Sequence, residues 1–195
     1  ELASHSSIPV INGLTNYSHP CQVMADILTF EELRGSIEGK KVIWLGDGNN
    51  VCTSYIHAAA KFGFNLVVAS PKEFEPDPNA IKRANQSGTF VKLISDPIKA
   101  IDNADLVVTD TYTSMHHQKL NLNERFEMFR GYQVNSELMS KASKRAIFLH
   151  CLPAHRNFEV TDEVIDGPQS AVFQGAENRM HIQKTIMKWC IKGSE

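Results

Sequence analysis

Six short runs of β-branched and other apolar residues recur along the chain from residue 41 onward, and their spacing constrains the fold more than any other feature. The stretches between them are amphipathic or rich in Ala, and several open with Ser, Thr, Asp or Pro, which favour helix N-termini. Strands that alternate with helices in this way form parallel sheets. The expected strands are 42–45, 66–69, 90–94, 106–109, 147–150 and 171–173, and the expected helices are 54–62, 78–86, 97–103, 136–142 and 161–165.

We therefore predict an α/β fold in which a doubly wound, mainly parallel, Rossmann-like sheet carries helices on both faces. Right-handed crossovers favour the strand order 3-2-1-4-5, with the sixth run unplaced. Ligands of such sheets bind beyond the carboxyl ends of the strands, where the winding reverses. Three polar segments, 46–50, 110–115 and 150–153, follow strands that meet there. The pattern predicts one binding crevice.

Composition narrows the class of partner. The chain has 195 residues, 42% of them hydrophobic, and a formal net charge of -2, so it offers no broad positive field for nucleic acid or anionic lipid. It contains no apolar run of about 20 residues and no secretory signal. We expect a small-molecule partner, a cytoplasmic protein with reduced cysteines, and, because the chain starts at Glu1 rather than Met, a fragment or processed product.

The segment 47–50 follows a strand and opens a helix, where a dinucleotide fingerprint would lie. The third glycine of that fingerprint is replaced by Val51, and no acidic residue ends the second strand, so nicotinamide binding is disfavoured. An Asx turn that caps the helix is the structural alternative. Asp110, after the fourth strand, could hold an ammonium group or orient an amine, or it could serve as a cap.

Further candidates stand at helix starts and after the fifth strand. Cys151 could be a nucleophile only beside a base, and it is otherwise a buried apolar residue or a wall that positions a substrate. His19 and Gln22 lie at the start of a helix opened by Pro20, which suits a carbonyl or phosphate group, and Arg179 suits phosphate. The histidines lack metal-ligand spacing, and we expect no metal.

The first and last helices each carry two apolar stripes, whereas one sheet covers only one face of a helix. We expect a second domain or subunit to cover the other face, unless the two helices pack on each other. The stripes of the first helix are Cys21, Met24, Ala25 and Leu28, and Val23, Ile27 and Phe30; those of the last are Ala176, Met180, Met187 and Ile191, and Ile182, Ile186 and Trp189.

Five motifs, VINGLTNYSHPCQ, WLGDGNN, DTYTSM, HCLPAHR and AENRMH, stand in this order between residues 8 and 191. Together they resemble the motif series of ornithine carbamoyltransferases, most closely the bacterial ones. The resemblance implies transfer of the carbamoyl group from carbamoyl phosphate to the δ-amine of ornithine, which gives citrulline and phosphate, as in arginine biosynthesis. It also implies a homo-oligomer, a trimer in that family, without metal or cofactor.

The resemblance also assigns site residues. It implies that carbamoyl phosphate is bound by His19, Gln22 and Arg179, with Cys151 and Leu152 between the two substrates. It implies that ornithine is bound by Asn50, Asp110, Ser114 and Met115. Cys151 and Asp110 would be the catalytic residues, with Cys151 positioning the substrate rather than attacking it.

Two departures from the family pattern stand out. The Ser-Thr-Arg-Thr phosphate loop has no counterpart, so we expect little activity without the domain that carries it, and His116 stands where the family usually has Gly. We expect an interdomain segment over 1–34, an ornithine-binding domain over 35–175, and a C-terminal helix over 176–195 that packs on the absent domain. The rival hypotheses are a carbamoyltransferase for aspartate, putrescine or acylated ornithine, and a non-catalytic binding or assembly module.

Overall fold

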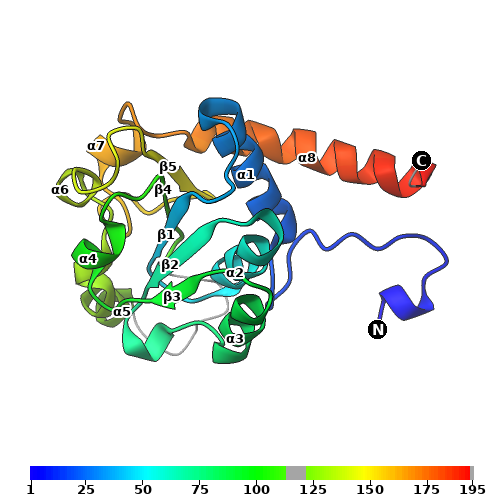
Figure 1. Cartoon of the computed structure of the whole chain (residues 1–195), viewed down its shortest axis with the longest axis horizontal. Coiled ribbons are helices and arrows are strands. Elements are labelled where there is room, and N and C mark those ends of the chain that lie inside the picture. The colour runs from blue at the N-terminus through cyan, green and yellow to red at the C-terminus, as the bar shows by residue number, and fades with distance from the viewer. Residues whose placement is uncertain (113–121, 194–195) are drawn as a thin grey trace.

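The computed structural model describes residues 1–112 and 122–193 and has a parallel sheet at its centre (Figure 1). The five strands are β1 (Lys41–Leu45), β2 (Asn65–Ala69), β3 (Val91–Leu93), β4 (Leu106–Thr109) and β5 (Ile147–His150). Their order is β3-β2-β1-β4-β5, which confirms the predicted α/β class and strand order. Within the described ranges, no helix is long and apolar enough to cross a membrane.

The central strand β1 pairs with β2 on one side and β4 on the other, so the winding reverses between β1 and β4. The register of the strand pairing aligns the ends of β1, β4 and β5. Leu45 at the end of β1 pairs with Thr109 at the end of β4, which in turn pairs with His150 at the end of β5. The residues that follow these strands therefore start from one edge of the sheet, where doubly wound proteins bind their ligands.

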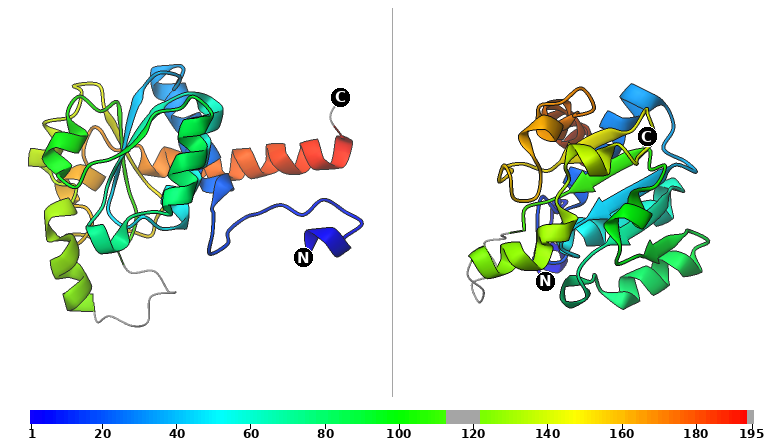
Figure 2. Two further views of the ribbon diagram at one scale, coloured as in Figure 1. Left: turned by 60° about the horizontal axis from the view of Figure 1, so that its bottom comes forward. Right: turned by 90° about the vertical axis from the view of Figure 1, so that its left-hand side faces the viewer.

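Helices cover both faces of the sheet, as the left view of Figure 2 shows. One face is covered by α1 (Pro20–Arg34), α2 (Asn50–Phe62) and α3 (Pro78–Gln86), and the other by α4 (Pro97–Ile101), α6 (Ser136–Met139) and α7 (Asp162–Ile165). The remaining helices are α5 (Leu122–Phe129) and α8 (Val172–Lys192), with 3-10 turns η1 (Ala3–His5), η2 (Lys72–Phe74) and η3 (Arg130–Tyr132).

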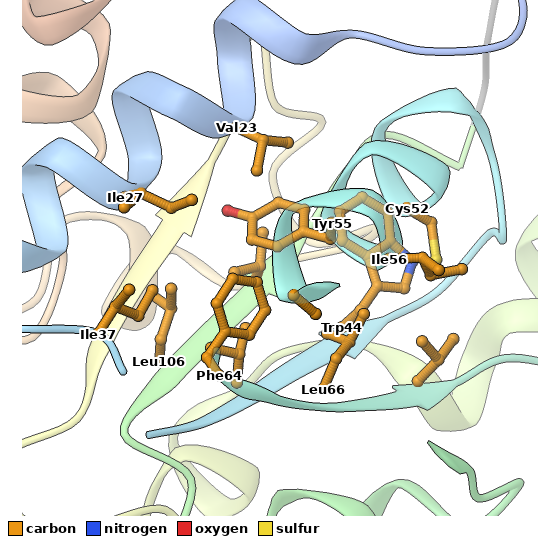
Figure 3. Packing of buried hydrophobic residues seen from close by; sticks show 14 of the residues in the cluster. Val23, Ile27, Ile37, Trp44, Cys52, Tyr55, Ile56, Phe64, Leu66 and Leu106 are labelled. Carbon is orange, nitrogen blue, oxygen red and sulfur yellow. The ribbon is translucent and has the colours of Figure 1, made fainter. Parts of the chain in front are cut away.

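The strands read as continuous apolar runs because both of their faces are buried. In β1, Val42 and Trp44 face the helices α1 to α3, whereas Ile43 and Leu45 face the other layer. Figure 3 shows the first of these cores, in which Trp44 packs beside Tyr55 of α2, with ring centroids 5.6 Å apart. Burial on both sides leaves only the loops at the strand ends free to carry chemistry.

The sixth predicted strand, 171–173, does not form. The chain runs beside β5 only through a bridge between Ser170 and Phe148, and α8 begins at Val172. In this segment Val172 is buried whereas Phe173 is 70% exposed, and the next buried residue on the helix is Gly175. This three-residue spacing is helical, and a run of three apolar residues was too short to distinguish it from a strand.

The two end helices differ in how far they are covered. Both predicted stripes of α1 are largely buried, with Cys21 and Val23 each 2% exposed, because α1 packs between α2 and α8. For α1 the structure therefore shows the alternative, in which the two end helices pack on each other. The C-terminal half of α8 projects from the body (Figure 1), and Met180, Trp189 and Ile191 are 52%, 63% and 84% exposed.

Candidate functional site

The loop after β1 begins the site with two glycines that have structural causes. Gly46 has φ 120°, a region that side chains rarely adopt. Gly48 packs on the segment after η2: its N–H donates to the Phe74 carbonyl at 2.7 Å, and a Cβ there would lie 2.3 Å from the Pro76 nitrogen. These contacts fix where the loop delivers the next residue, Asn49.

Asn49 caps α2 and reaches across the switch point. Its Oδ1 accepts hydrogen bonds from the N–H groups of Val51 and Cys52 at 2.9 and 3.1 Å, which confirms the predicted Asx cap. Its Nδ2 donates to Oδ2 of Asp110 at 2.7 Å. The cap therefore fixes a donor that holds the carboxylate at the end of β4.

Asp110 and Cys151 meet across the neighbouring strand ends. The Cys151 Sγ lies 2.7 Å from Asp110 Oδ1, which also accepts the Thr111 N–H at 2.7 Å. Burial, followed by the charge of Asp110, raises the pKa of the Cys151 thiol far above its ordinary value. The thiol is therefore protonated at neutral pH and donates to the carboxylate, and it is not an activated nucleophile.

The loop after β5 is held by two buried side chains. His150 Nδ1 accepts the N–H of Leu152 at 2.8 Å, and its Nε2 lies 3.4 Å from Oε1 of Glu159. Glu159 also accepts the N–H of His155. Leu152 has φ 55°, unusual for a residue with a side chain, and a cis peptide joins it to Pro153. The loop thus presents Cys151 and Leu152 from a fixed backbone.

His19 enters the same region from the start of α1. Its backbone N–H donates to Ser54 Oγ of α2 at 2.6 Å, and its ring is buried. Burial, followed by the charge of Arg179, lowers the pKa of the imidazole, which is therefore neutral at pH 7. Among residues 1–112 and 122–193, its Nδ1 has no hydrogen-bond partner, so a ring nitrogen remains for a ligand.

Gln22 and Arg179 bring together the first and last helices. The Arg179 Nη1 donates to Gln22 Oε1 at 2.5 Å, and Gln22 Nε2 donates to Asp26 Oδ1 at 2.9 Å. The buried Nε of Arg179 has no partner in the part of the chain that is described. A guanidinium with an unused buried N–H is suited to bind a carbonyl or phosphate oxygen.

The structure thus brings together five of the residues proposed from sequence: His19, Gln22, Asp110, Cys151 and Arg179. Asn50 lies at the rim instead, where its Nδ2 donates to the Thr15 carbonyl at 2.7 Å. Ser114 and Met115, as well as the atypical His116, lie outside the described residues.

Sequence reasoning missed three residues that support the site. For Asn49 the sequence indicated only that the segment 47–50 forms an Asx turn, and the contact of Asn49 with Asp110 depends on the pairing of β1 with β4. Asp26, one turn after Gln22 on α1, carried a signal in its spacing because residues four apart share a helix face. Glu159 carried no local signal, since it reaches His150 through a loop.

Within the described ranges, the donor atoms of Asp110, His150 and Cys151 lie within 4.8 Å of one another, a cluster that could hold a metal ion. These donors already have partners: Cys151 donates to Asp110, and His150 Nδ1 accepts from Leu152. A metal bound by Asp110 and Cys151 would have to replace the hydrogen bond between them. Sequence spacing could not reveal this cluster because its members come from two strands.

The fold and these side chains define a doubly wound α/β domain that carries a guanidinium and a carboxylate near its switch point. Residues 38–190 match the family model "Aspartate/ornithine carbamoyltransferase, Asp/Orn binding domain", and residues 1–32 match the carbamoyl-P binding domain of the same family. The chain belongs to the aspartate/ornithine carbamoyltransferase family.

Named relatives agree with this assignment. The chain is 54% identical over 191 residues to an ornithine carbamoyltransferase of Roseobacter denitrificans, covering 98% of this chain and 62% of that protein. It is 56% identical to one of Nitrobacter winogradskyi, covering 98% and 61%. The ornithine carbamoyltransferase structure of Pyrococcus furiosus superposes with a TM-score of 0.93 at 46% identity, covering 100% of this chain and 63% of that one. The chain thus spans about 62% of the length of the curated relatives it matches.

Proposed function

We propose that this chain forms the ornithine-binding half of an ornithine carbamoyltransferase together with part of its carbamoyl-phosphate site. The proposal depends on one observation: a carboxylate and a guanidinium, which carry opposite charges, lie near the same edge of the sheet. Asp110 and Cys151 lie at the ends of β4 and β5, and the Gln22–Arg179 pair approaches from α1 and α8. The charge of Arg179 influences the pKa of the Cys151 thiol, so the two subsites are neighbours.

The carboxylate subsite suits an amine. Asp110 is 7% exposed, and it accepts hydrogen bonds from Asn49, Thr111 and Cys151. These three donors hold the carboxylate in place, where it can accept a hydrogen bond from a substrate ammonium group and orient it. We propose that Asp110 binds ornithine, with Asn50, Ser114 and Met115 completing the subsite as the family resemblance implies.

The cationic subsite suits the carbamoyl donor. Arg179 supplies N–H groups for phosphate oxygens, and the neutral His19 ring supplies a nitrogen near them without a second positive charge. Gln22 presents a carbonyl oxygen that could accept from the carbamoyl NH₂ group. We propose, as the family resemblance implies, that Cys151 and Leu152 lie between the two bound substrates.

In the proposed reaction the neutral δ-amine of ornithine attacks the carbonyl carbon of carbamoyl phosphate. The new C–N bond forms a tetrahedral intermediate, the C–O bond to phosphate breaks, and the nitrogen loses a proton, which leaves citrulline and phosphate. Cys151 forms no bond in this scheme, which agrees with its raised pKa. The protein contributes proximity and fixed charges near the developing oxyanion.

Calorimetry with ornithine tests the proposal. Wild-type chain is expected to bind ornithine in preference to aspartate or putrescine, because only ornithine combines a carboxylate with two amines. Asp110→Asn is expected to weaken ornithine binding by about tenfold to a hundredfold, the usual range for a hydrogen bond to a charged group. The matched control is Asp102→Asn, the same change at an exposed residue before β4. Equal ornithine affinity in wild type and Asp110→Asn would refute the assignment.

The assembly and setting of the protein are part of the same proposal. We propose that the exposed apolar side chains of α8, including Met187 and Trp189, contact another domain or subunit of a homo-oligomer, a trimer by family resemblance. We propose that domain boundaries lie at residues 34 and 175, and α8 begins slightly before the boundary at residue 175.

All four cysteines are free, which supports the expected reducing, cytoplasmic setting. By itself the chain is expected to form citrulline at least a hundredfold more slowly than a relative of full length, because each missing transition-state donor costs about 10²–10³.

A further inference from the structure

Asp26 is a buried carboxylate in the middle of α1 that the proposed reaction does not use. It is 2% exposed and forms no ion pair with any described residue. Its two oxygens accept separate hydrogen bonds, Oδ1 from Gln22 Nε2 at 2.9 Å and Oδ2 from the Tyr55 hydroxyl at 2.8 Å. Figure 3 shows the Tyr55 hydroxyl pointing from the core toward α1. A buried charge without a counter-ion is costly, so this one requires an explanation.

The chemistry of its neighbours shows what Asp26 does to Gln22. A carboxamide has one end that only accepts and one end that only donates. Gln22 lies between Asp26, which accepts when ionised, and Arg179, which can only donate. The carboxamide can satisfy both partners in one orientation alone, with Nε2 toward Asp26 and Oε1 toward Arg179.

The backbone of α8 also lies close to the Asp26 carboxylate. A Cβ at Gly175 would lie 3.8 Å from Asp26 Oδ1 and 3.2 Å from Leu149 Cδ2, so this part of α8 lies beside the Asp26 carboxylate. Gly175 is four residues before Arg179, and residues four apart share a helix face. Asp26 therefore stands where the helix that carries Arg179 crosses the helix that carries Gln22.

We propose that Asp26 is a positioning residue that holds the Gln22 carbonyl oxygen toward the carbamoyl group of the bound donor. The inference rests on the proposed function, because it assumes that carbamoyl phosphate occupies the Arg179 subsite. An oxygen at this position accepts a hydrogen bond from the carbamoyl NH₂, whereas the reversed carboxamide would place a donor against a donor. Asp26 would thus favour carbamoyl phosphate over a ligand that has only phosphate oxygens.

The protonation of Asp26 gives this arrangement a pH dependence. Burial raises the pKa of Asp26 to about 6, opposed by hydrogen bonds from Tyr55 and Gln22 and by the charges of Arg179 and His150. These groups face it from α2, α1, α8 and the end of β5, where the Cys151 thiol also senses its charge. Protonated Asp26 can donate as well as accept, so the carboxamide loses its single orientation below about pH 6.

The test compares carbamoyl phosphate with inorganic phosphate as ligands of the 195-residue chain. Asp26→Asn keeps the shape but removes the obligate acceptor, and Asp26→Ala removes the acceptor entirely. Both are expected to weaken carbamoyl phosphate binding by about tenfold and inorganic phosphate binding by less than about twofold. The matched control is Ile27→Val, a conservative apolar change at the next residue of α1, which is also buried, and it should alter neither affinity.

A second measurement does not depend on any ligand. The side-chain amide resonances of Gln22, assigned by their loss in Gln22→Glu, are followed by NMR in the wild type from pH 5 to pH 8. They are expected to shift with a midpoint near pH 6. The shift should disappear in Asp26→Asn and persist in Ile27→Val. If Asp26→Ala fails to fold, the nearly isosteric Asp26→Asn supplies the comparison for this measurement.

The outcomes separate the two proposals. Selective loss of carbamoyl phosphate binding together with the Gln22 shift supports the positioning role. Equal weakening of both ligands, or a Gln22 resonance indifferent to Asp26, overturns it. If the wild type binds neither ligand, the proposed function fails, and the NMR titration alone then decides whether Asp26 orients Gln22.

Discussion

The Cys151 thiol donates to the Asp110 carboxylate at 2.7 Å, and this contact joins the ends of the adjacent strands β4 and β5. Burial and the nearby negative charge both keep the thiol protonated. A cysteine that the motif HCLP placed at a reaction centre therefore works as a hydrogen-bond donor. Its partner, Asp110, accepts this hydrogen bond through Oδ1.

Alkylation by iodoacetamide tests the state of this thiol. In a Cys190→Ala background, Cys151 is expected to react at pH 8 at least about tenfold more slowly than a free thiol of ordinary pKa, because only the thiolate is nucleophilic. Adding Asp110→Asn should speed the reaction, since the Asp110 charge raises the pKa of Cys151. Peptide mass spectrometry identifies the modified cysteine. Reaction at the ordinary rate in the Asp110-containing protein would argue for an activated nucleophile.

Asn49→Ala is expected to reduce both stability and ornithine binding. Loss of the α2 cap should lower the free energy of unfolding by about 1 kcal/mol. Loss of the 2.7 Å hydrogen bond to Asp110 should weaken ornithine binding by about tenfold. Asp77→Ala removes a comparable cap from α3, where Asp77 accepts the Asn79 N–H at 2.9 Å, and it should lower stability without affecting binding. Urea unfolding and calorimetry measure the two effects.

Asp26→Asn is expected to gain stability relative to the wild type as pH rises from 4 to 6. The folded pKa of Asp26, about 6, exceeds its ordinary value of 3.8, so the native state binds more protons than the unfolded state in this window. The stabilising contribution of protonated Asp26 is thus complete below 3.8 and is lost as pH rises through about 6. The shift amounts to about 3 kcal/mol. Asn cannot titrate, so the difference between the two urea-unfolding free energies should change by roughly that amount, while the difference for Ile27→Val should stay constant with pH.

Gly48→Ala is expected to destabilise the loop that carries Asn49. The new Cβ would lie 2.3 Å from the Pro76 nitrogen and 2.6 Å from the Phe74 oxygen, both in backbone that cannot rotate away. Overpacking of this kind costs about 1–3 kcal/mol, and the displaced loop should also bind ornithine less tightly. Gly131→Ala serves as the control in thermal unfolding, because its new Cβ would meet no other described residue beyond its chain neighbours within 4 Å. Equal melting temperatures for the two variants would show that the loop yields freely.

Much of the fold could be predicted from the sequence because the relevant information is local. Strands buried on both faces must be apolar along their length, and the ranges 42–45, 66–69, 106–109 and 147–150 were therefore visible. Right-handed crossovers then left few strand orders, and the expected one formed. The prediction of a strand at 171–173 was wrong because a helix start and a short strand have the same apolar pattern over three residues.

Part of the site could also be predicted from the sequence. Asp110 and Cys151 follow neighbouring strands, and register obliges residues in those positions to meet. The residue patterns indicated His19 and Arg179 separately, and only the family resemblance assigned them to one ligand. In the tertiary structure the two side chains are close enough for the charge of Arg179 to lower the pKa of His19.

The sequence by itself determined the strand runs, the helix caps and the polar strand ends, because each depends on residues within a few positions of one another. Only the tertiary structure decided that Asn49 rather than Asn50 contacts Asp110, that Glu159 supports His150, and that Asp26 fixes Gln22 against Arg179. Those contacts join segments up to 157 residues apart. Their geometry depends on how two helices cross over the end of a twisted sheet, and no local pattern specifies that crossing.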